Sequence, residues 1–283
     1  AGMRIGMTLL LWTAFVTEEH LPLVSSLREL GFDGVELPLG GGETAHYERL
    51  APGLRATGAA VTTCLGLEPE NDPASPDPTV RAAALERLRG AIDSTAALGG
   101  DVLCGPLHSA FKVFSDRGPT EDQFRWSAEV LHAAGEHAAT QGVTLALEPL
   151  NRFECYLANT VAQGLRLVEL ADHPSVTLHY DTHHMHIEER SAADAIGRAA
   201  TALGHVHISE NDRGVPGRGQ VAWGPTFEAL RAAEYDGWLT IEAFGTADPE
   251  FAAAIHIWRD FVDDPMTLAR EGLGFIQGQW GQA

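Results

Sequence analysis

The amino-acid sequence predicts a single (β/α)8 TIM barrel, an α/β fold in which eight parallel strands alternate with helices. Short apolar runs of about 5–8 residues alternate along the chain with longer amphipathic stretches, which is the pattern of buried strands and surface helices. Eight such pairs fit into 283 residues, the size of one closed barrel. Hydrophobic residues make up 45% of the chain, which is the ordinary share for a globular protein.

The eight expected strands are short and apolar, as strands buried on both faces of a parallel sheet should be. They cover residues 4–10, 34–39, 60–67, 101–107, 143–150, 176–185, 205–209 and 238–244. The run at 176–185 is expected only to begin as a strand.

The expected helices carry apolar residues at helical spacing. They cover residues 18–30, 46–57, 79–98, 120–140, 160–171, 192–203, 225–233 and 250–270. Residues 69–78 are rich in Pro, Asp and Asn and predict a loop. A glycine stands between a helix and the next strand six times, a position where glycine often caps the helix: Gly31, Gly58, Gly99, Gly142, Gly204 and Gly237.

A doubly wound open sheet is the alternative fold. It would need a ligand signature such as a glycine fingerprint after the first strand, and residues 11–17 contain no glycine. No linker divides the chain, so we expect residues 1–283 to form one domain. Ala1 and Gly2 precede Met3, and we expect them to be a short remnant ahead of the native start.

The formal net charge of −20 comes from 19 Lys and Arg against 39 Asp and Glu. Such a charge repels phosphate backbones and acidic lipids, so we expect no nucleic-acid or membrane partner. No apolar run approaches the ~18 residues of a membrane span. Cys64, Cys104 and Cys155 have no close spacing and predict reduced thiols in a cytoplasmic protein.

Charged residues end four consecutive apolar strands, at Glu148, Asp181, His207 and Glu242. In a barrel the C-terminal strand ends meet at one rim, and neighbouring strands lie about 4.8 Å apart. One such acid alone would be an ordinary loop or N-cap residue, but four in a row are costly unless they are paired or bind an ion. Three carboxylates and one imidazole suit Mn²⁺, Mg²⁺ or Co²⁺ better than a structural Zn²⁺.

Further polar groups follow these strand ends and can hold substrate hydroxyls: Glu154, His184, Arg213 and Arg218. We expect His183 and His186 to be solvated or to lie outside the ligand set. His205 lies two residues deeper than His207 and is expected to be a hydrogen-bonded residue of the barrel interior.

Three further groups outside the ligand set carry expectations of their own. Glu188 and Glu189 should be exposed. Trp12 and residues 111–114 can line a pocket or pack in the core, and the sequence does not separate these possibilities. His108 is a candidate for one extra ligand.

These motifs resemble the sugar isomerases and epimerases of the xylose-isomerase-like superfamily, and within it the ketose 3-epimerases of the D-tagatose and D-psicose type. The resemblance covers nearly the whole chain. The matching stretches are residues 147–160 (LEPLNRFECYLANT), 181–189 (DTHHMHIEE), 204–219 (GHVHISENDRGVPGRG) and 239–244 (LTIEAF), with 104–106 at the end of the fourth strand.

The resemblance implies a role for each matching residue. Glu148, Asp181, His207 and Glu242 match ligands of one divalent metal ion, with Mn²⁺ expected first. Glu148 and Glu242 also match the acid–base pair, and a third set matches residues that hold the ketose near C1 and C2: Glu154, His184 and Arg213. The sequence departs from the pattern at His183, where Phe is expected, and at His186, where Asn is expected.

The implied reaction interconverts free ketoses that are epimeric at C3. One carboxylate removes the C3 proton next to a metal-polarised carbonyl, and the other returns it from the opposite face through a metal-stabilised enediolate. A free sugar is expected because the acidic loop at residues 245–250 has no basic residue where barrels often bind phosphate. The family also implies a homo-oligomer, either a dimer or a tetramer.

Four other functions remain open at this point. An aldose–ketose isomerase of the same superfamily would move hydrogen between C1 and C2, and a keto-polyol dehydratase would release water. An apurinic endonuclease of the same fold needs more histidines around a zinc cluster, and the charge of −20 opposes DNA. A non-catalytic sugar-binding barrel would not need an acid–base pair around a metal.

Overall fold

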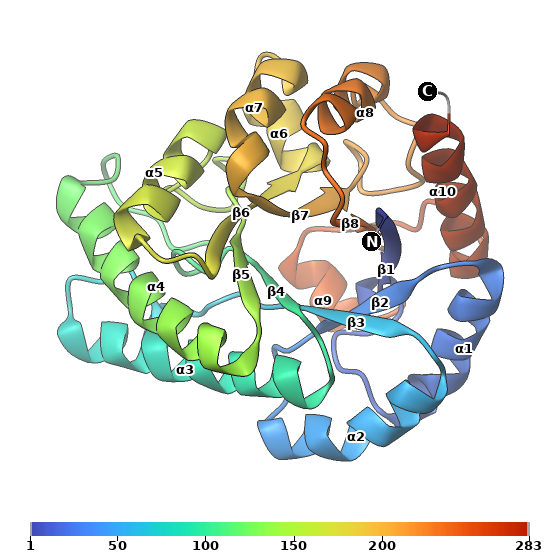
Figure 1. Cartoon of the computed structure of the whole chain (residues 1–283), viewed down its shortest axis with the longest axis horizontal. Helices are drawn as coiled ribbons and strands as arrows, with labels where there is room; N and C mark the ends of the chain where they lie inside the picture. The colour runs from blue at the N-terminus through green and yellow to red at the C-terminus, as the bar shows by residue number, and fades with distance from the viewer. Residues whose placement is uncertain (1, 282–283) are drawn as a thin grey trace.

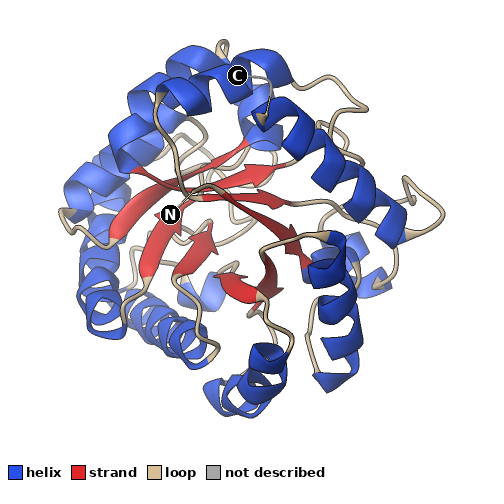
Figure 2. Cartoon of the chain, turned by 45° about the vertical axis from the view of Figure 1, so that its right-hand side comes forward, coloured by secondary structure: helices blue, strands red, loops and turns tan. Residues whose placement is uncertain are grey.

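The computed structural model describes residues 2–281 as a closed barrel with the strand order β1 to β8, so the predicted TIM barrel is confirmed. Every strand pairs in parallel with its neighbours, and β1 closes the ring by pairing with β8. The helices surround the ring of strands (Figures 1 and 2). Ala1 of the predicted remnant lies outside the described residues. Within residues 2–281, none of the helices combines the length and apolarity needed to cross a membrane.

Seven of the eight strands are shorter than the sequence predicted, mainly at their C-terminal ends, whereas β7 begins two residues earlier than predicted, at the last residue of the helix expected at 192–203. The strands are β1 Arg4–Thr8, β2 Gly34–Pro38, β3 Ala60–Cys64, β4 Val102–Gly105, β5 Thr144–Leu147, β6 Val176–Asp181, β7 Leu203–Ile208 and β8 Trp238–Ile241. The apolar runs continue past the ladder because the first loop residues are also buried, as at Leu65, Leu107 and Leu150.

The helices pack around this ring. They are α1 Leu21–Leu30, α2 Thr44–Ala56, α3 Pro78–Ala97, α4 Glu121–Gln141, α5 Val161–Ala171, α6 Thr182–Glu188, α7 Ala192–Ala199, α8 Trp223–Ala232, α9 Pro249–Ala254 and α10 Pro265–Trp280. Short 3₁₀ turns cover Leu9–Leu11, Glu18–His20, Pro69–Asn71 and Ala200–Ala202. A large apolar core fills the layer between the strands and the helices.

The predicted helix at residues 250–270 is wrong, because two helices occupy this region. α9 ends at Ala254 and α10 begins at Pro265. Proline fits the first turn of a helix, where its missing N–H has no partner to lose, and the Asp264 side chain accepts a hydrogen bond from Met266 N at 3.0 Å. The segment between the two helices returns the chain to the barrel mouth, where Ile257 lines the central pocket.

Four of the six predicted glycine caps have the left-handed backbone that a C-cap needs: Gly31, Gly58, Gly99 and Gly142. Gly204 and Gly237 do not have it, so the cap prediction is wrong there. Gly204 lies inside β7, where a Cβ atom would collide with the Thr177 side chain of β6. At Gly237 a Cβ atom would lie 2.6 Å from the hydroxyl oxygen of Tyr235. Both glycines serve close packing.

Trp238 fills the N-terminal end of the barrel interior. Its side chain is buried among Val102, Cys104 and Ala146, and the Arg4 guanidinium lies 4.3 Å from its ring centroid. Gly34 makes room for the indole, since a Cβ atom there would lie 2.7 Å from Trp238 Cη2. The bottom of the barrel is therefore apolar, and the polar side chains gather higher up, toward the C-terminal strand ends.

Candidate active site

Four consecutive strands carry the predicted ligand residues to one rim, as the sequence indicated. Asp181 ends β6 and His207 lies in β7, while Glu148 and Glu242 directly follow β5 and β8. All four are buried, with at most 7% of each residue exposed. Glu148, His207 and Glu242 line a pocket of about 850 Å³ that opens at the C-terminal face of the barrel.

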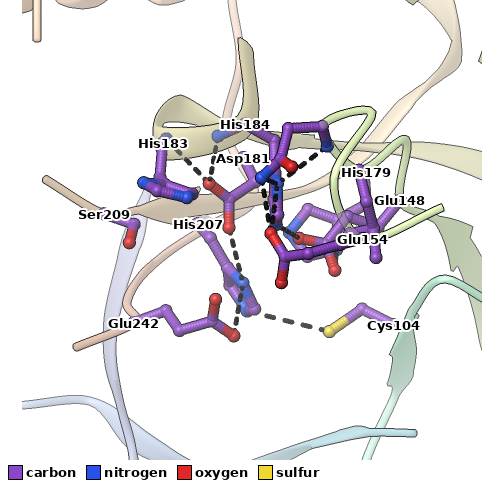
Figure 3. A network of polar contacts seen from close by, with 12 residues as sticks. Cys104, Glu148, Glu154, His179, Asp181, His183, His184, His207, Ser209 and Glu242 are labelled. Carbon is purple, nitrogen blue, oxygen red and sulfur yellow. Dashed lines mark hydrogen bonds and ion pairs between the residues drawn. The ribbon is translucent and has the colours of Figure 1, made fainter. Parts of the chain in front are cut away.

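His207 lies at the centre of this group (Figure 3). Its Nδ1 atom is 3.5 Å from Asp181 Oδ2 and 3.2 Å from Glu242 Oε2. The other carboxylate oxygen of Asp181 caps α6 by accepting hydrogen bonds from His183 N at 2.8 Å and His184 N at 3.2 Å. This N-cap ends the strand at Asp181 and begins a helix at Thr182, within the run at 176–185 that was expected only to begin as a strand.

Arg213 adds a positive charge to this acidic group. Its Nη1 atom donates to Glu242 Oε1 at 2.5 Å and to Ser209 Oγ at 3.0 Å, and it lies 3.4 Å from Asp181 Oδ2. Its backbone is left-handed with φ of 68°, and Arg213 O accepts a hydrogen bond from Phe244 N at 3.0 Å. The loop after β7 is therefore tied to the loop after β8 at the residue that carries the guanidinium.

The charges at the rim shift one another's protonation. Burial raises the pKa of Glu148 well above its usual range, and the nearby Asp181 and Glu242 add to the rise. Burial also disfavours the charged form of Asp181, but Arg213 and His184 outweigh it and hold that pKa well below its usual range. For His207, the carboxylates of Glu36 and Glu242 outweigh burial and raise the pKa well above its usual range.

The donor set fits a divalent cation. Among residues 2–281, Glu148 Oε2 and His207 Nδ1 are buried without a hydrogen-bond partner. Donor atoms of Glu148, His179, Asp181 and His207 all lie within 4.8 Å of one another. Carboxylate oxygens with imidazole nitrogens suit a hard to borderline metal. A cation at this point would satisfy the two unpaired atoms and offset the repulsion between the carboxylates.

This compact group contains His179 where the sequence prediction has Glu242. Glu242 turns instead toward Arg213, although its other oxygen stays 3.2 Å from His207 Nδ1. Neither ring nitrogen of His179 has a hydrogen-bond partner in the described part of the chain. The sequence did contain a signal for His179, because it lies two residues before Asp181 on one strand and must point to the same side.

The predicted substrate residues converge beside the rim. His184 Nε2 lies 3.7 Å from Glu148 Oε2 and 2.9 Å from Arg213 Nη2. His184 Nδ1 accepts a hydrogen bond from Asn151 N at 3.0 Å and lies 3.6 Å from Glu154 Oε2. The three predicted substrate residues all line the pocket that Glu148 and Glu242 line. Arg218 does not reach it, because it pairs with Glu271 at 2.8 Å on the surface.

The three other histidines of β7 and α6 have different surroundings. His205 is inside the barrel, with Nε2 2.8 Å from Glu36 Oε2, which confirms the expectation of a hydrogen-bonded interior residue. His183 lines the pocket, and its Nδ1 atom lies 2.9 Å from Asn211 O. Burial and the charge of Arg213 lower the pKa of His183 to about 3. His186 is exposed.

The expectation that Glu188 and Glu189 are exposed is wrong. Glu188 is not exposed, because its carboxylate accepts hydrogen bonds from Arg152 N at 3.0 Å and from Arg152 Nε at 2.9 Å. Glu189 is half-buried and accepts a hydrogen bond from Val161 N at 2.8 Å. Both acids connect α6 to neighbouring segments. His108 has both ring nitrogens in contact with protein atoms, Glu148 O at 2.8 Å and Ser109 Oγ at 3.0 Å, so it offers no unpaired donor to a metal.

The sequence left open whether several aromatic residues line the pocket or pack in the core, and the structure gives them different positions. Phe111 lines the pocket, whereas Trp12 is half-buried and packs against the apolar core. Phe114 is 51% exposed and lies outside the pocket lining.

Lys112 belongs to the segment 111–114 that the sequence left open as pocket lining, but sequence reasoning missed His256, which lines the pocket from an opposite loop, and the contact between the two residues. Lys112 Nζ donates to Ala254 O at 2.5 Å and lies 2.9 Å from His256 Nε2, while Lys112 N donates to Glu154 O at 2.8 Å. Both Lys112 and His256 have left-handed backbones, with φ of 57° and 60°. Three loops are thus tied together across the pocket mouth. No local sequence pattern marks a contact between residues 144 positions apart.

The fold and this polar centre define a (β/α)8 barrel with an enzyme-like site at the C-terminal ends of β5 to β8. Residues 24–278 match the model of the xylose isomerase-like TIM barrel family, and the chain belongs to this family. The prediction from the sequence motifs is confirmed at this level.

Relatives extend over almost the whole chain. An L-ribulose 3-epimerase of Mesorhizobium japonicum is 36% identical and covers 96% of this chain and 93% of its own. A ketose 3-epimerase of Arthrobacter globiformis is 34% identical and covers 97% of this chain and 96% of its own. With such relatives, the chain is an enzyme of the isomerase class.

Solved structures agree with this assignment. A structure of L-ribulose 3-epimerase is 35% identical and superposes with a TM-score of 0.92 over 99% of this chain and 95% of that one. A D-allulose 3-epimerase from Methylomonas sp. in complex with D-allulose is 30% identical, with a TM-score of 0.92 over 98% of this chain and 97% of that one.

Proposed function

We propose that this enzyme is a ketose 3-epimerase that acts on free ketoses with one divalent metal ion. The observation that carries the proposal is the pair of strand-end carboxylates, Glu148 and Glu242, which line one pocket with His207 between their strands. The names of the relatives, L-ribulose 3-epimerase and ketose 3-epimerase, support the same reaction. We assign the metal to Glu148, Asp181, His207 and Glu242.

Two carboxylates are what an epimerisation at C3 requires. One group removes the proton from C3 on one face of the sugar, and the other group returns a proton to the opposite face. Burial raises the pKa of Glu148 well above its usual range, which brings it nearer to the working pH of a general acid or base. When bound, the divalent cation supplies Lewis-acid stabilisation of the negative charge that develops beside the C2 carbonyl.

Neighbouring residues hold the sugar so that its C3 atom lies between Glu148 and Glu242. We assign Glu154, His184 and Arg213 to the hydroxyl and carbonyl oxygens near C1 and C2. Arg213 and His184 lie 2.9 Å apart beside Glu148, so hydrogen bonds from both can fix one end of the ketose. Glu154 is 20% exposed in its side chain and can accept a hydrogen bond from a hydroxyl at the pocket side.

A panel of ketoses tests the proposal. After dialysis against a chelator, the enzyme should be inactive, and Mn²⁺ or Co²⁺ should restore activity. Chromatography of products from D-psicose, D-tagatose, D-fructose and L-ribulose should show the C3 epimer. Products with the carbonyl moved to C1 would instead identify an aldose–ketose isomerase, and full activity in protein shown metal-free by elemental analysis would refute the metal centre.

The same panel tests the form of the substrate. The loop after β8 carries Asp248 and Glu250 into the pocket lining, and the ammonium group of Lys112 is already held by Ala254 O and His256. A phosphate at the mouth would therefore meet negative charge. We expect a much higher kcat/KM for a free ketose than for its phosphate ester, and the reverse order would refute this part.

A further inference from the structure

Glu36 of β2 is buried inside the barrel directly beneath the rim residues, on a strand that carries none of the proposed ligands. Its Oε1 atom lies 2.6 Å from His207 Nε2. Its Oε2 atom lies 2.8 Å from His205 Nε2 and accepts a hydrogen bond from Thr62 Oγ1 at 2.9 Å. One carboxylate thus holds two imidazole rings of β7.

Both oxygens of Glu36 are occupied, Oε1 by His207 and Oε2 by His205 and Thr62. A carboxylate accepts hydrogen bonds. In this arrangement the proton of each short contact lies on the imidazole, on Nε2 of His205 and on Nε2 of His207.

This arrangement determines which nitrogen of His207 is available. A histidine that binds a metal does so as the neutral imidazole, which carries one proton and has a free lone pair on the other nitrogen. With the proton on Nε2, the lone pair is on Nδ1, the atom that faces Asp181 at 3.5 Å and Glu242 at 3.2 Å. Nδ1 makes no hydrogen bond within residues 2–281, and the two carboxylates that face it are themselves proposed ligands of the cation.

We infer that Glu36 is a positioning residue for the metal centre: by accepting the Nε2 proton of His207, it leaves Nδ1 as the ligand atom and fixes the ring toward the rim. The inference rests on the proposed function, which places a cation among the rim residues. Carboxylates that hold the second nitrogen of a ligating histidine commonly change metal affinity by 10–100-fold when they are lost.

A second metal beneath the rim is the rival explanation. Donor atoms of Glu36, Cys104, His205 and His207 also lie within 4.8 Å of one another, and a set with one cysteine and two histidines suits Zn²⁺. Two ligand atoms of a tetrahedral Zn²⁺ site lie roughly 3.3 Å apart, given bonds of about 2.0–2.1 Å. The contacts of 2.6 and 2.8 Å from Glu36 to the two histidines are shorter and are hydrogen bonds.

Calorimetric titration of the metal-free protein with Mn²⁺ tests the inference. Glu36→Met removes the acceptor and should weaken binding by about 10–100-fold. Glu36→Gln retains one amide oxygen for one imidazole and should weaken binding less. Thr62→Val is the matched control, because it removes the other partner of Glu36 Oε2 and leaves His207 in place. It should bind Mn²⁺ nearly as the unaltered protein does.

Nuclear magnetic resonance of histidine nitrogens gives a readout that needs no variant. In the Mg²⁺-loaded unaltered protein, His207 should carry one slowly exchanging proton on Nε2, assigned by comparison with His207→Gln. In Glu36→Met this protected signal should be lost. A His207 proton found on Nδ1 in the loaded protein overturns the inference, even if the Glu36 variants fail to fold.

The remaining outcomes separate the two proposals. Mn²⁺ binding that is equally tight in Glu36→Met and in the unaltered protein overturns the inference and leaves the proposed function standing. An unaltered protein that binds no divalent cation overturns both. Two Zn²⁺ ions per chain, one of them lost in Cys104→Ser, would mean that Glu36 is a ligand and not a positioning residue.

Discussion

Glu148 and Glu242 follow β5 and β8, at the two ends of the set of rim residues, and their surroundings differ. Glu148 Oε2 has no hydrogen-bond partner among the described residues, whereas Glu242 Oε1 accepts a short hydrogen bond from Arg213. Two carboxylates with different partners are suited to different steps of one proton transfer. The asymmetry makes the two residues separable by experiment.

Replacing Glu148 or Glu242 with Gln retains an oxygen donor but removes the base. Each variant should lose turnover by roughly 10²–10⁴-fold, the usual contribution of one acid or base, and by more if metal binding also weakens. In D2O, each variant should wash deuterium into C3 of only one epimer, because the remaining carboxylate faces one side of the sugar.

Glu129→Gln is the control, because this glutamate of α4 has a side chain that is 64% exposed. Its activity should match that of the unaltered enzyme. Equal exchange of both epimers in both rim variants, or deuterium at C1 instead of C3, would replace the two-base epimerase mechanism with an isomerase mechanism.

At the scale of elements, the loops after the strands extend the barrel upward and hold one another. Beyond the ends of β3 and β4, Leu67 and Ala110 form a parallel bridge, and Phe111 N donates to Leu67 O at 2.9 Å. Asp72 joins the same pair of loops, since its Oδ1 atom accepts hydrogen bonds from Ala74 N at 2.9 Å and from Ala110 N at 3.1 Å. Phe111 of this loop lines the pocket.

Asp72→Asn should keep both hydrogen bonds, because an amide oxygen can replace Oδ1. Burial raises the pKa of Asp72, so the ionised form costs free energy in the folded state. The variant should therefore have an equal or higher free energy of unfolding at pH 7, measured by urea titration. Asp72→Ala should lose about 1–3 kcal/mol for each N–H left without an acceptor.

The raised pKa of Asp72 also predicts how the free energy of unfolding depends on pH. A carboxyl group whose pKa is raised on folding contributes its stability below the unfolded value of about 3.9, and this contribution is lost as the pH rises through the folded value. The advantage of Asp72→Asn over the unaltered protein should therefore shrink as the pH falls from 7 through the folded pKa. An advantage that grows on acidification would contradict the assignment.

At the scale of the whole molecule, the barrel separates an apolar lower end from a polar upper end. Trp238 fills the lower end and is 1% exposed. Gly6 of β1 and Gly34 of β2 leave space for its ring. The histidines and carboxylates begin one layer higher, where Glu36 and His205 meet. Stability and chemistry therefore depend on different layers of the same ring of strands.

Trp238→Ala should lower the free energy of unfolding by about 3–5 kcal/mol, since the bottom of the barrel cannot collapse to fill the cavity. Trp258→Ala is the matched control, because Trp258 is 73% exposed and its loss should change stability by no more than about 0.5 kcal/mol. Guanidinium unfolding of both variants measures the difference. Similar losses in the two variants would show that Trp238 does not plug the barrel.

The order of the elements and the identity of the rim residues could be predicted from the sequence for one reason. In a parallel barrel, chain order and spatial order coincide, so residues that end successive strands must meet at one rim. Glu148, Asp181, His207 and Glu242 were found in this way, each as the polar end of an apolar run. The apolar–polar pattern is local, so it can be recognised in the sequence without knowledge of any distant contact.

Tertiary structure alone decided the contacts that cross the barrel. Glu36 meets His207 across 171 positions of sequence, and Lys112 meets His256 across 144, with no local pattern that marks either pair. The direction of a long side chain depends on the rotamer that its neighbours leave open. For this reason Glu242 could be placed at the rim from the sequence, whereas its turn toward Arg213 required the folded chain.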